Sequence, residues 1–420
     1  MKRSIDLNYG NSKIPFEYDP ARFDVIGDAV QMAPLSDVEL GSLFDNPFES
    51  PGIEDIVSAN ESVLIVVPDA TRNIGAGQIA NLLVRRLIAA GVTPFDIGII
   101  FATGLHRPVT REERISILTP FIEQRIKTYE HDPRDLGGIL KLGDTRSGIP
   151  VELNRKLIES DHVVLIGGVQ FHYFAGFTGG RKLICPGLAS KRTVVKTHGL
   201  AFDAKSRSRA AHVGPSILEK NPVHQGFIEA VEMAPPAYAF NSLFDGGGNV
   251  TDLVSGDWKS SHLEACRRHA EKYTVEVEGK RDFVIVSCGG YPHDVNMVQA
   301  HKAIETASLV CKEGGSIVVL AECPDGAGSA EFEKWFSYGM AENLAERLAE
   351  KYSVGGQTAW SLKQKSEKFD IRIFSELSGD MTRSMGLVKF ADLAAAAASL
   401  KNAAGGYILP FGAKFLPLPK

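Results

Sequence analysis

The 420-residue sequence is poor in cysteine, in net charge and in long apolar runs, and each shortage excludes a class of protein. The five cysteines are scattered, odd in number and free of any CxxC pair, so they indicate neither a disulfide framework nor a thiolate metal site. A formal net charge of -5 argues against a general surface for nucleic acid or anionic membrane. No apolar run reaches the ~20 residues that a bilayer-spanning helix requires. The basic N-terminal stretch lacks the apolar core of a secretory signal, so we expect a cytoplasmic protein.

The composition is that of an ordinary globular protein, with 44% hydrophobic and 23% charged residues. At about 150 residues per domain, a chain of this length should form two or three units of structure. Short β-branched runs alternate with helical patterns, which predicts an α/β fold with mainly parallel sheets and flanking helices. The candidate strands are residues 63–67, 97–102, 162–168, 283–289, 315–322 and 371–374.

Polar clusters follow three of the candidate strands at the point where each strand ends: PDATR, TGLHRP and VQFHYF. Ligands of an open α/β sheet bind at the carboxyl ends of its strands. We therefore expect the side chains of Asp69, Arg72, His106, Arg107 and His172 to be neighbours. Taken singly, the aspartate is equally a turn or N-cap residue, the arginines are surface charges and the histidines are structural groups. Two histidines across a cleft could act as acid and base near neutral pH.

The stretch FAGFTGGRKLICPG (174–187) places four glycines around a single lysine, Lys182. It departs from the phosphate-loop pattern GxxxxGK[ST], because Arg181 separates Gly180 from the lysine and a leucine follows it, so magnesium-nucleotide chemistry is disfavoured. Clustered glycines indicate unusual dihedrals or close approach of the backbone to a ligand, and with Thr178 they could bind one phosphate. The lysine could be the counter-ion of that phosphate or a nucleophile that becomes covalently modified.

Three further residues are candidates for a site. His198, in the sequence KTHG, is either a metal ligand or a structural histidine. Gln299 and Lys302 follow the apolar run of 283–289, and their spacing of three places them on one helix face. Such a pair could bind a carboxylate, although a solvated face is the plainer interpretation.

The motifs PDATR, GLHRPVTREE, FHYFAGFTGGRKLICPG, THG and GGYPHDVNMVQAHK together resemble the nickel-pincer nucleotide-dependent lactate racemase family. The resemblance covers most of the chain in order. It implies two α/β domains with the active site in the cleft between them. We expect residues 1–277 plus 404–420 to form an N-terminal cofactor-tethering catalytic domain, and residues 278–403 a C-terminal domain that contributes substrate-binding residues. The strand-helix rhythm, interrupted from about 200 to 275, resumes at this boundary.

The cofactor that the resemblance implies is a pyridinium-3,5-bisthiocarboxylic acid mononucleotide that carries nickel. Its attachment would be a thioamide at Lys182, and the metal ligand from the protein would be His198. Its phosphate would occupy the glycine loop, and Asp69 would lie near its ribose. The cofactor-binding residues would be Lys182, Asp69, Thr178, Gly179, Gly180 and His198.

The activity that the resemblance implies is racemisation or epimerisation of a 2-hydroxy acid. One of His106 and His172 would take the hydroxyl proton while a hydride passes to the cofactor, which gives a transient 2-keto acid. Return of the hydride to the other face, with the opposite histidine donating the proton, would invert the centre. The substrate would be held by Arg72, Gln299, Lys302 and Val298.

Small departures from the family pattern predict a substrate other than, or larger than, lactate. Val298 stands where the lactate enzymes of this family have a tyrosine, and alanine replaces glycine after Lys302. Leu105 stands where the family has a small polar residue, and this difference also indicates a substrate other than, or larger than, lactate. The partners implied are the 2-hydroxy acid and the enzymes that build the cofactor, with no nucleic acid and no membrane. The oligomeric state stays open, a homo-oligomer included.

Two other functions compete with a racemase. A non-catalytic carboxylate- or nucleotide-binding homologue would keep the fold but never receive the cofactor. The joint presence of Lys182, His198, His106 and His172 argues against it, because a binding protein has no use for the tether. A zinc hydrolase is disfavoured, because the sequence has no closely spaced His/Glu ligand motif.

Overall fold

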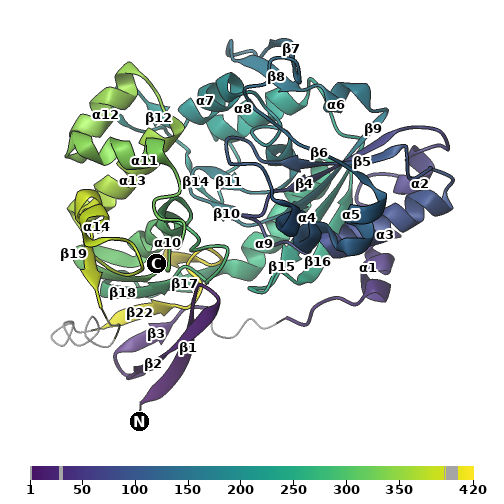
Figure 1. The fold of residues 1–420 in the computed structure, drawn as a ribbon. Coiled ribbons are helices and arrows are strands. Elements are labelled where there is room, and N and C mark those ends of the chain that lie inside the picture. The colour runs from purple at the N-terminus through teal and green to yellow at the C-terminus, as the bar shows by residue number, and fades with distance from the viewer. Residues whose placement is uncertain (1, 28–31, 392, 394–404) are drawn as a thin grey trace. The chain divides into compact units, whose positions relative to one another are not determined.

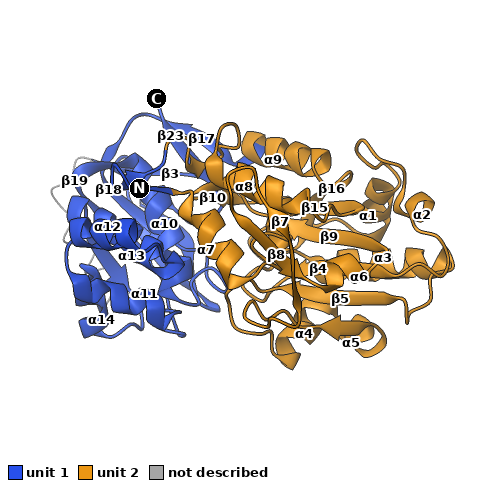
Figure 2. Cartoon of the chain, turned by 90° about the horizontal axis from the view of Figure 1, so that it is seen from above, with its two compact units in different colours: residues 1–31, 202–210, 272–420 blue, residues 32–201, 211–271 orange. Residues whose placement is uncertain are grey.

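A computed structural model describes residues 2–27, 32–391, 393 and 405–420. The chain forms two compact units, each built from segments that are distant in sequence (Figure 2). Unit 1 contains residues 1–31, 202–210 and 272–420, and unit 2 contains residues 32–201 and 211–271. Within the described ranges, no helix combines the length and the apolarity needed to cross a bilayer.

Unit 2 is built on a six-stranded sheet with the order β16-β15-β9-β4-β5-β6 (Figure 1). The pairs from β15 to β6 are parallel, and β16 pairs antiparallel with β15. The elements are α1 (Asp37–Phe44), α2 (Ile53–Ile56), β4 (Val63–Pro68), α3 (Ala76–Ala89), β5 (Ile97–Ala102), α4 (Arg111–Leu118), α5 (Pro120–Arg125), β6 (Lys127–Tyr129), β7 (Ile139–Asp144), β8 (Pro150–Asn154), α6 (Lys156–Glu159), β9 (His162–Gly168), β10 (Phe171–His172), β11 (Ala175–Phe177), the 3₁₀ helix η1 (Gly180–Leu183), α7 (Lys191–Gly199), β14 (Gly214–Pro215), α8 (Pro222–Val231), β15 (Tyr238–Phe244), β16 (Val250–Gly256) and α9 (Ser260–Tyr273).

The central strands of this sheet are buried because both of their faces are covered. All six residues of β4 are buried, as are all seven of β15. Helix α3 contributes Ile79, Leu83 and Leu87 to the same core. Continuous apolar strands of this kind are typical of parallel sheets with helices on both faces. The α/β fold class predicted from the sequence is confirmed.

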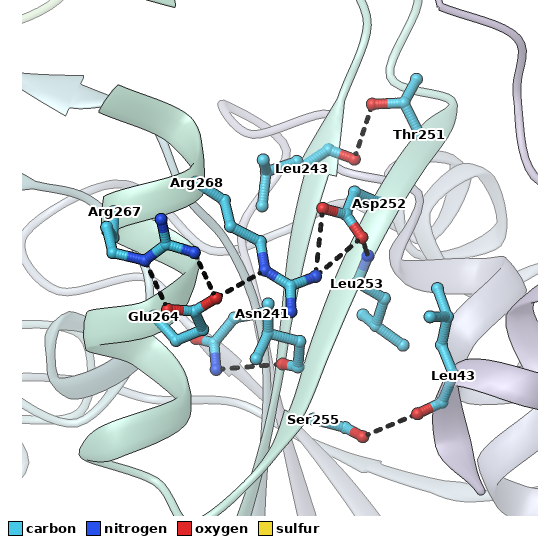
Figure 3. Close-up of polar contacts among 11 residues, drawn as sticks. Leu43, Asn241, Leu243, Thr251, Asp252, Leu253, Ser255, Glu264, Arg267 and Arg268 are labelled. Atoms are coloured by element: carbon cyan, nitrogen blue, oxygen red, sulfur yellow. Dashed lines mark hydrogen bonds and ion pairs between the residues drawn. The ribbon is translucent and has the colours of Figure 1, made fainter. Parts of the chain in front are cut away.

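Helix α9 is attached to the antiparallel edge of the sheet by a polar network (Figure 3). Arg268 donates from Nε to Glu264 at 2.8 Å and from Nη1 to Asp252 on β16 at 3.4 Å. Asn241, buried on β15, donates to the hydroxyl of Ser261 at 3.0 Å. These contacts fix the position of the helix face that carries His262, which is described below.

Unit 1 has its own six-stranded parallel sheet, with the order β21-β20-β19-β18-β22-β3. Its elements are β1 (Arg3–Tyr9), β2 (Ser12–Tyr18), β3 (Phe23–Val25), β12 (Phe202–Asp203), β13 (Ser208–Arg209), β17 (Thr274–Val277), β18 (Arg281–Ser287), α10 (Met297–Val310), β19 (Cys311–Leu320), α11 (Ala330–Trp335), the 3₁₀ helix η2 (Phe336–Tyr338), α12 (Ala341–Glu350), α13 (Val354–Lys368), β20 (Asp370–Phe374), α14 (Gly379–Met385), β21 (Val388–Phe390), β22 (Gly406–Leu409) and β23 (Leu416–Pro419). The β1–β2 hairpin packs Leu7, Phe16 and Tyr18 on this sheet.

The two ends of the chain belong to unit 1, which differs from the expected grouping of the C-terminal segment with the first domain. Strand β22 lies between β18 and β3, and β23 pairs with β17. The physical reason is that residues 406–409 are buried on both faces and therefore fit an interior strand. The division into a cofactor-tethering domain and a substrate-binding domain stays a prediction.

Candidate active site

The predicted clusters at the ends of β4, β5 and β9 belong to adjacent strands. Strand β4 lies between β9 and β5, with Pro68 opposite Ala102. The segments that leave β4 and β5 therefore start side by side, and they bring together Asp69 and His106. The Nδ1 atom of His106 lies 2.5 Å from Oδ2 of Asp69. Arg107, the residue after His106, forms an ion pair with Glu113 on α4.

Asp69 is buried and stays ionised. Burial raises the pKa of its carboxyl group, but the charge and hydrogen bond of His106, the hydroxyl of Thr71 and the charge of Arg72 together lower it to about 2. The hydroxyl and the backbone N–H of Thr71 both donate to Oδ1, at 2.6 and 3.1 Å. A carboxylate can only accept, so Nδ1 of His106 carries a proton, and Nε2 is the ring nitrogen that can take up or release the second one. That nitrogen can act as a base.

His172 has the opposite arrangement of protons. It is buried at the end of β10, and the backbone N–H groups of Phe174 and Ala175 point at its Nδ1 from 3.4 and 3.2 Å. Backbone N–H groups only donate, so Nδ1 of the neutral ring accepts and Nε2 carries the proton. The neutral ring of His172 thus holds its proton on Nε2, whereas the bond to Asp69 places the proton of His106 on Nδ1. This difference suits an acid paired with a base.

The glycine loop lies against the end of β9. Gly179 and Gly180 have φ of +75° and +49°, a region that favours glycine. A Cβ at Gly180 would lie 2.5 Å from the ring of His262, so the backbone there is pressed against a side chain. The hydroxyl of Thr178 donates to the carbonyl of Gly168 at 2.7 Å and accepts from another backbone N–H. These glycines are explained by packing; binding of a phosphate stays a prediction.

Lys182 lies among aromatic rings on η1. Its Nζ is 5.4 Å from the ring centroid of Phe174 and 5.5 Å from that of Phe227, within the range of a cation–π contact. The ring of His198 lies 5.3 and 5.6 Å from the same two phenylalanines. The proposed tether and the proposed metal ligand therefore share one aromatic wall, and the ring of His172 contacts Phe174 as well, at 4.4 Å.

His198 has the properties that a metal ligand requires. Its Nδ1 lies 2.9 Å from the carbonyl oxygen of Val194, one turn earlier on α7, so Nδ1 donates and Nε2 keeps its lone pair. Burial, then the charge of Lys182, lowers its pKa to about 3, and His106 is close enough to add to this effect. The ring is therefore neutral at physiological pH. Among the described residues, no three acidic, histidine or cysteine side chains cluster as a metal site built from protein ligands alone.

Unit 1 brings together the remaining candidates on helix α10. Asn296 caps this helix by accepting from the N–H of Gln299 at 3.0 Å. Nζ of Lys302 lies 2.5 Å from Oε1 of Gln299, which confirms the shared helix face. Val298 is half-buried in the same first turn. Whether these residues bind a substrate stays a prediction.

One group of functional interest was missed by sequence reasoning. The sequence pattern gives Arg181 no role beyond its place before Lys182, and it does not single out His262. The structure buries both, with Nη1 of the arginine 3.2 Å from Nε2 of the histidine. An arginine inside a glycine-rich, otherwise apolar segment is a usable signal, because a charge in such a segment needs compensation.

The sequence matches two family models, described as the lactate racemase N-terminal domain over residues 9–210 and the lactate racemase C-terminal domain over residues 277–378. A lactate racemase of Thermoanaerobacterium thermosaccharolyticum is 30% identical over 338 residues, which is 79% of this chain and 78% of that protein. A lactate racemase of Lactiplantibacillus plantarum is 31% identical over 336 residues, 78% of this chain and 77% of that protein.

Solved structures agree with these matches. The apoprotein of the T. thermosaccharolyticum lactate racemase aligns with a TM-score of 0.88 and 25% identity, over 99% of this chain and 100% of that one. A crystal structure of a protein from Thermotoga maritima aligns with a TM-score of 0.73 and 20% identity, over 93% of this chain and 100% of that one, and supports the fold alone.

Proposed function

Since the chain belongs to the lactate racemase family, we propose that it racemises or epimerises a 2-hydroxy acid with a nickel-pincer nucleotide attached to Lys182. The observation that supports this best is the cluster in unit 2. A lysine and a neutral histidine with a free Nε2 lone pair face the same two phenylalanine rings, and the Asp69–His106 pair lies nearby.

The cofactor would be held by residues of unit 2. Lys182 would form the thioamide, and Nε2 of His198 would bind nickel. When bound, this group supplies a hydride acceptor, so that the substrate can pass through its 2-keto acid. The protein supplies binding, orientation and exclusion of water, and the buried aromatic rings of Phe174 and Phe227 serve that last purpose.

The protons would be moved by the two histidines. Nε2 of His106 can accept the hydroxyl proton of one enantiomer, and Asp69 holds the ring in the correct tautomer and stabilises the imidazolium that forms. Nε2 of His172 already carries a proton that it can donate. For the other enantiomer the roles are exchanged. The half-buried Arg72, whose guanidinium acts on Asp69, would attract the substrate carboxylate.

The substrate is proposed to be larger than lactate or to differ from it in its side chain. The support is Val298, a small apolar residue in the first turn of α10, beside Gln299. An assay of cofactor-loaded protein against 2-hydroxy acids of increasing side-chain size should give the highest kcat/KM for a substrate other than lactate. A preference for lactate would contradict this proposal and leave the racemase proposal standing.

The test of the function is intact-protein mass spectrometry with metal analysis, on protein made in a host that matures the cofactor. We expect added mass and about one nickel per chain. Both should be absent from Lys182→Ala and retained in Lys191→Ala, which removes an exposed lysine nearby. An unmodified, nickel-free wild-type chain from that host would favour the alternative, a non-catalytic carboxylate- or nucleotide-binding homologue.

A further inference from the structure

Arg181 is a buried charge without an acidic partner in the described part of the chain. It is 1% exposed. Its Nη2 donates to the carbonyl of Ala175 at 2.7 Å, and its Nη1 lies 3.2 Å from Nε2 of His262. Its Nε is buried and makes no hydrogen bond within the described residues. Burial lowers its pKa to about 10, so the guanidinium stays charged at neutral pH. A buried charge left uncompensated is strongly destabilising.

The neighbouring groups do not compensate this charge. Nε2 of His262 also lies 2.9 Å from the carbonyl oxygen of Thr178. A guanidinium only donates and a carbonyl only accepts, so this nitrogen can satisfy one of them and not both. Cys266, whose sulfur is 3.5 Å from the same nitrogen, is a neutral thiol because burial raises its pKa to about 12. The charge of Arg181 therefore has no balancing anion from these side chains.

A small cavity lies against this arginine, entirely within unit 2. Arg181, His224, Lys259 and His262 line it together with the apolar walls of Ile228 and Trp258. Nδ1 of His224 is buried and has no hydrogen-bond partner among the described residues. Burial, then Arg181 and Lys259, lowers the pKa of His224 to about 3, so its ring is neutral. Lys259 itself is balanced by Glu232, at 2.8 Å.

The size of the cavity restricts what it can hold. The volume of the cavity is about 20 Å³, and one water needs roughly 10–15 Å³. A single water or a monoatomic ion therefore fits, whereas a tetrahedral phosphate or a metabolite carboxylate does not. N–H donors with apolar walls and a net positive charge favour an anion over a cation.

We propose that this cavity binds a halide ion, chloride under physiological conditions, as the counter-ion of Arg181. The donors would be the guanidinium of Arg181, whose Nε makes no hydrogen bond, and the ring of His224, whose Nδ1 makes none. The site goes beyond the proposed racemase function and does not depend on it. It lies behind the loop that carries Lys182, where Gly180 is pressed against His262, so an occupied site would stabilise the loop that presents the tether.

The experiment uses bromide as a probe, because its anomalous scattering distinguishes it from water. Crystals of the wild-type chain grown in sodium bromide should show an anomalous peak within hydrogen-bond distance of Arg181. Crystals of Arg181→Met should lack it. A wild-type cavity that holds only water at high bromide would overturn the proposal.

A solution measurement covers the case in which the variant does not crystallise or fold. The melting temperature of the wild type should rise when chloride or bromide replaces gluconate at constant ionic strength. Arg181→Lys should keep part of this shift and Arg181→Met should lose it. Arg134→Met, the same change at an exposed arginine, should behave as the wild type. Equal halide responses in all four proteins would contradict the proposal, because that would be a general salt effect.

Discussion

The hydrogen bonds of three histidine rings decide what each ring can do. His106 donates from Nδ1 to a carboxylate, and His198 donates from Nδ1 to a backbone carbonyl, so Nε2 is the nitrogen of each ring that is left for chemistry. His172 accepts at Nδ1 from backbone N–H groups and carries its proton on Nε2. The same side chain thus occurs with different arrangements of its protons, and the difference lies in the group bonded to Nδ1. These arrangements fit the proposed roles of a base, a metal ligand and an acid.

Asp69→Asn tests the role of the carboxylate that orients His106. We expect kcat to fall by about 10²-fold or more, because the amide can hold the wrong tautomer and cannot stabilise the imidazolium. The pH profile of kcat should change, while nickel content stays near that of the wild type. Asp55→Asn, at an exposed aspartate, is the matched control. The variant could instead lose both the nickel and the added mass of the cofactor, with unchanged turnover for each cofactor that remains bound. That result would assign Asp69 to cofactor binding near the ribose.

His198→Ala tests the metal ligand separately from the tether. Because Lys182 remains, mass spectrometry should still find the added organic mass, while the nickel content per chain falls at least several-fold. His131→Ala is a useful comparison, since this buried histidine bonds Ala189 and Asn154 and lies outside the aromatic cluster. Nickel that remains stoichiometric in His198→Ala would exclude this residue as the ligand.

At the scale of elements, the strands determine where the loops begin, and the loops carry the candidate site residues. Strands β9, β4 and β5 are parallel neighbours, so their carboxyl ends present three loops at one edge. The glycine loop then packs back on the end of β9, with Gly180 against His262 of α9. Helix α9 is itself fixed by the network of Arg268, Glu264 and Asp252 (Figure 3).

Gly180→Ala should destabilise the protein through contact as well as backbone strain. Its Cβ would lie 2.5 Å from the His262 ring, at a φ of +49°. Gly148→Ala is the matched control, because Gly148 also has a positive φ, +77°, but nothing lies within 4 Å of its Cβ. Denaturant unfolding should show a loss of about 1 kcal/mol for the control and at least ~1 kcal/mol more for Gly180→Ala. Equal losses would mean that the loop moves away from the helix at little cost.

At the scale of the whole molecule, the chain passes through each unit more than once. Residues 202–210 belong to unit 1 although both neighbouring segments belong to unit 2. In unit 1 this segment packs Phe202 edge-on against Trp360, with ring centroids 5.1 Å apart. Arg209 pairs with the buried Glu305 of α10 at 3.1 Å, and Lys365 of α13 lies 3.4 Å from the same carboxylate. One carboxylate thus joins three segments that are distant in sequence.

The stability of unit 1 should depend on pH through Glu305. Burial raises the pKa of this carboxyl group, but Arg209, then Lys365 and Ser361, lower it to about 2. Because the folded pKa is below the unfolded one, the stabilisation is complete above about pH 4.5 and is lost as the pH falls toward 2. Its size is on the order of 3 kcal/mol.

Glu305→Gln isolates this contribution. The difference in unfolding free energy between the wild type and this variant should be largest at neutral pH and should shrink between about pH 4.5 and 2. Glu313→Gln, at an exposed glutamate paired with Lys368, should show a far smaller difference at every pH. A difference for Glu305→Gln that does not vary with pH would contradict the assignment of the ion pairs.

The sequence by itself determined the local elements and the strand ends at which the candidate site residues lie. All six expected strands are present, because apolar β-branched runs bounded by glycine and polar residues encode strands locally. The meeting of Asp69 with His106 was also predictable, since two adjacent parallel strands must end at the same edge.

Only the tertiary structure decided the contacts between residues distant in sequence. Periodicity carries no information on which strand β22 joins, on the burial of Arg181 beside a helix some 80 residues later, or on which nitrogen of each histidine holds the proton. These depend on desolvation and on hydrogen-bond partners that the folded chain alone brings together. That is why the sequence indicated a lysine in a glycine loop, whereas the structure disclosed the buried arginine beside it.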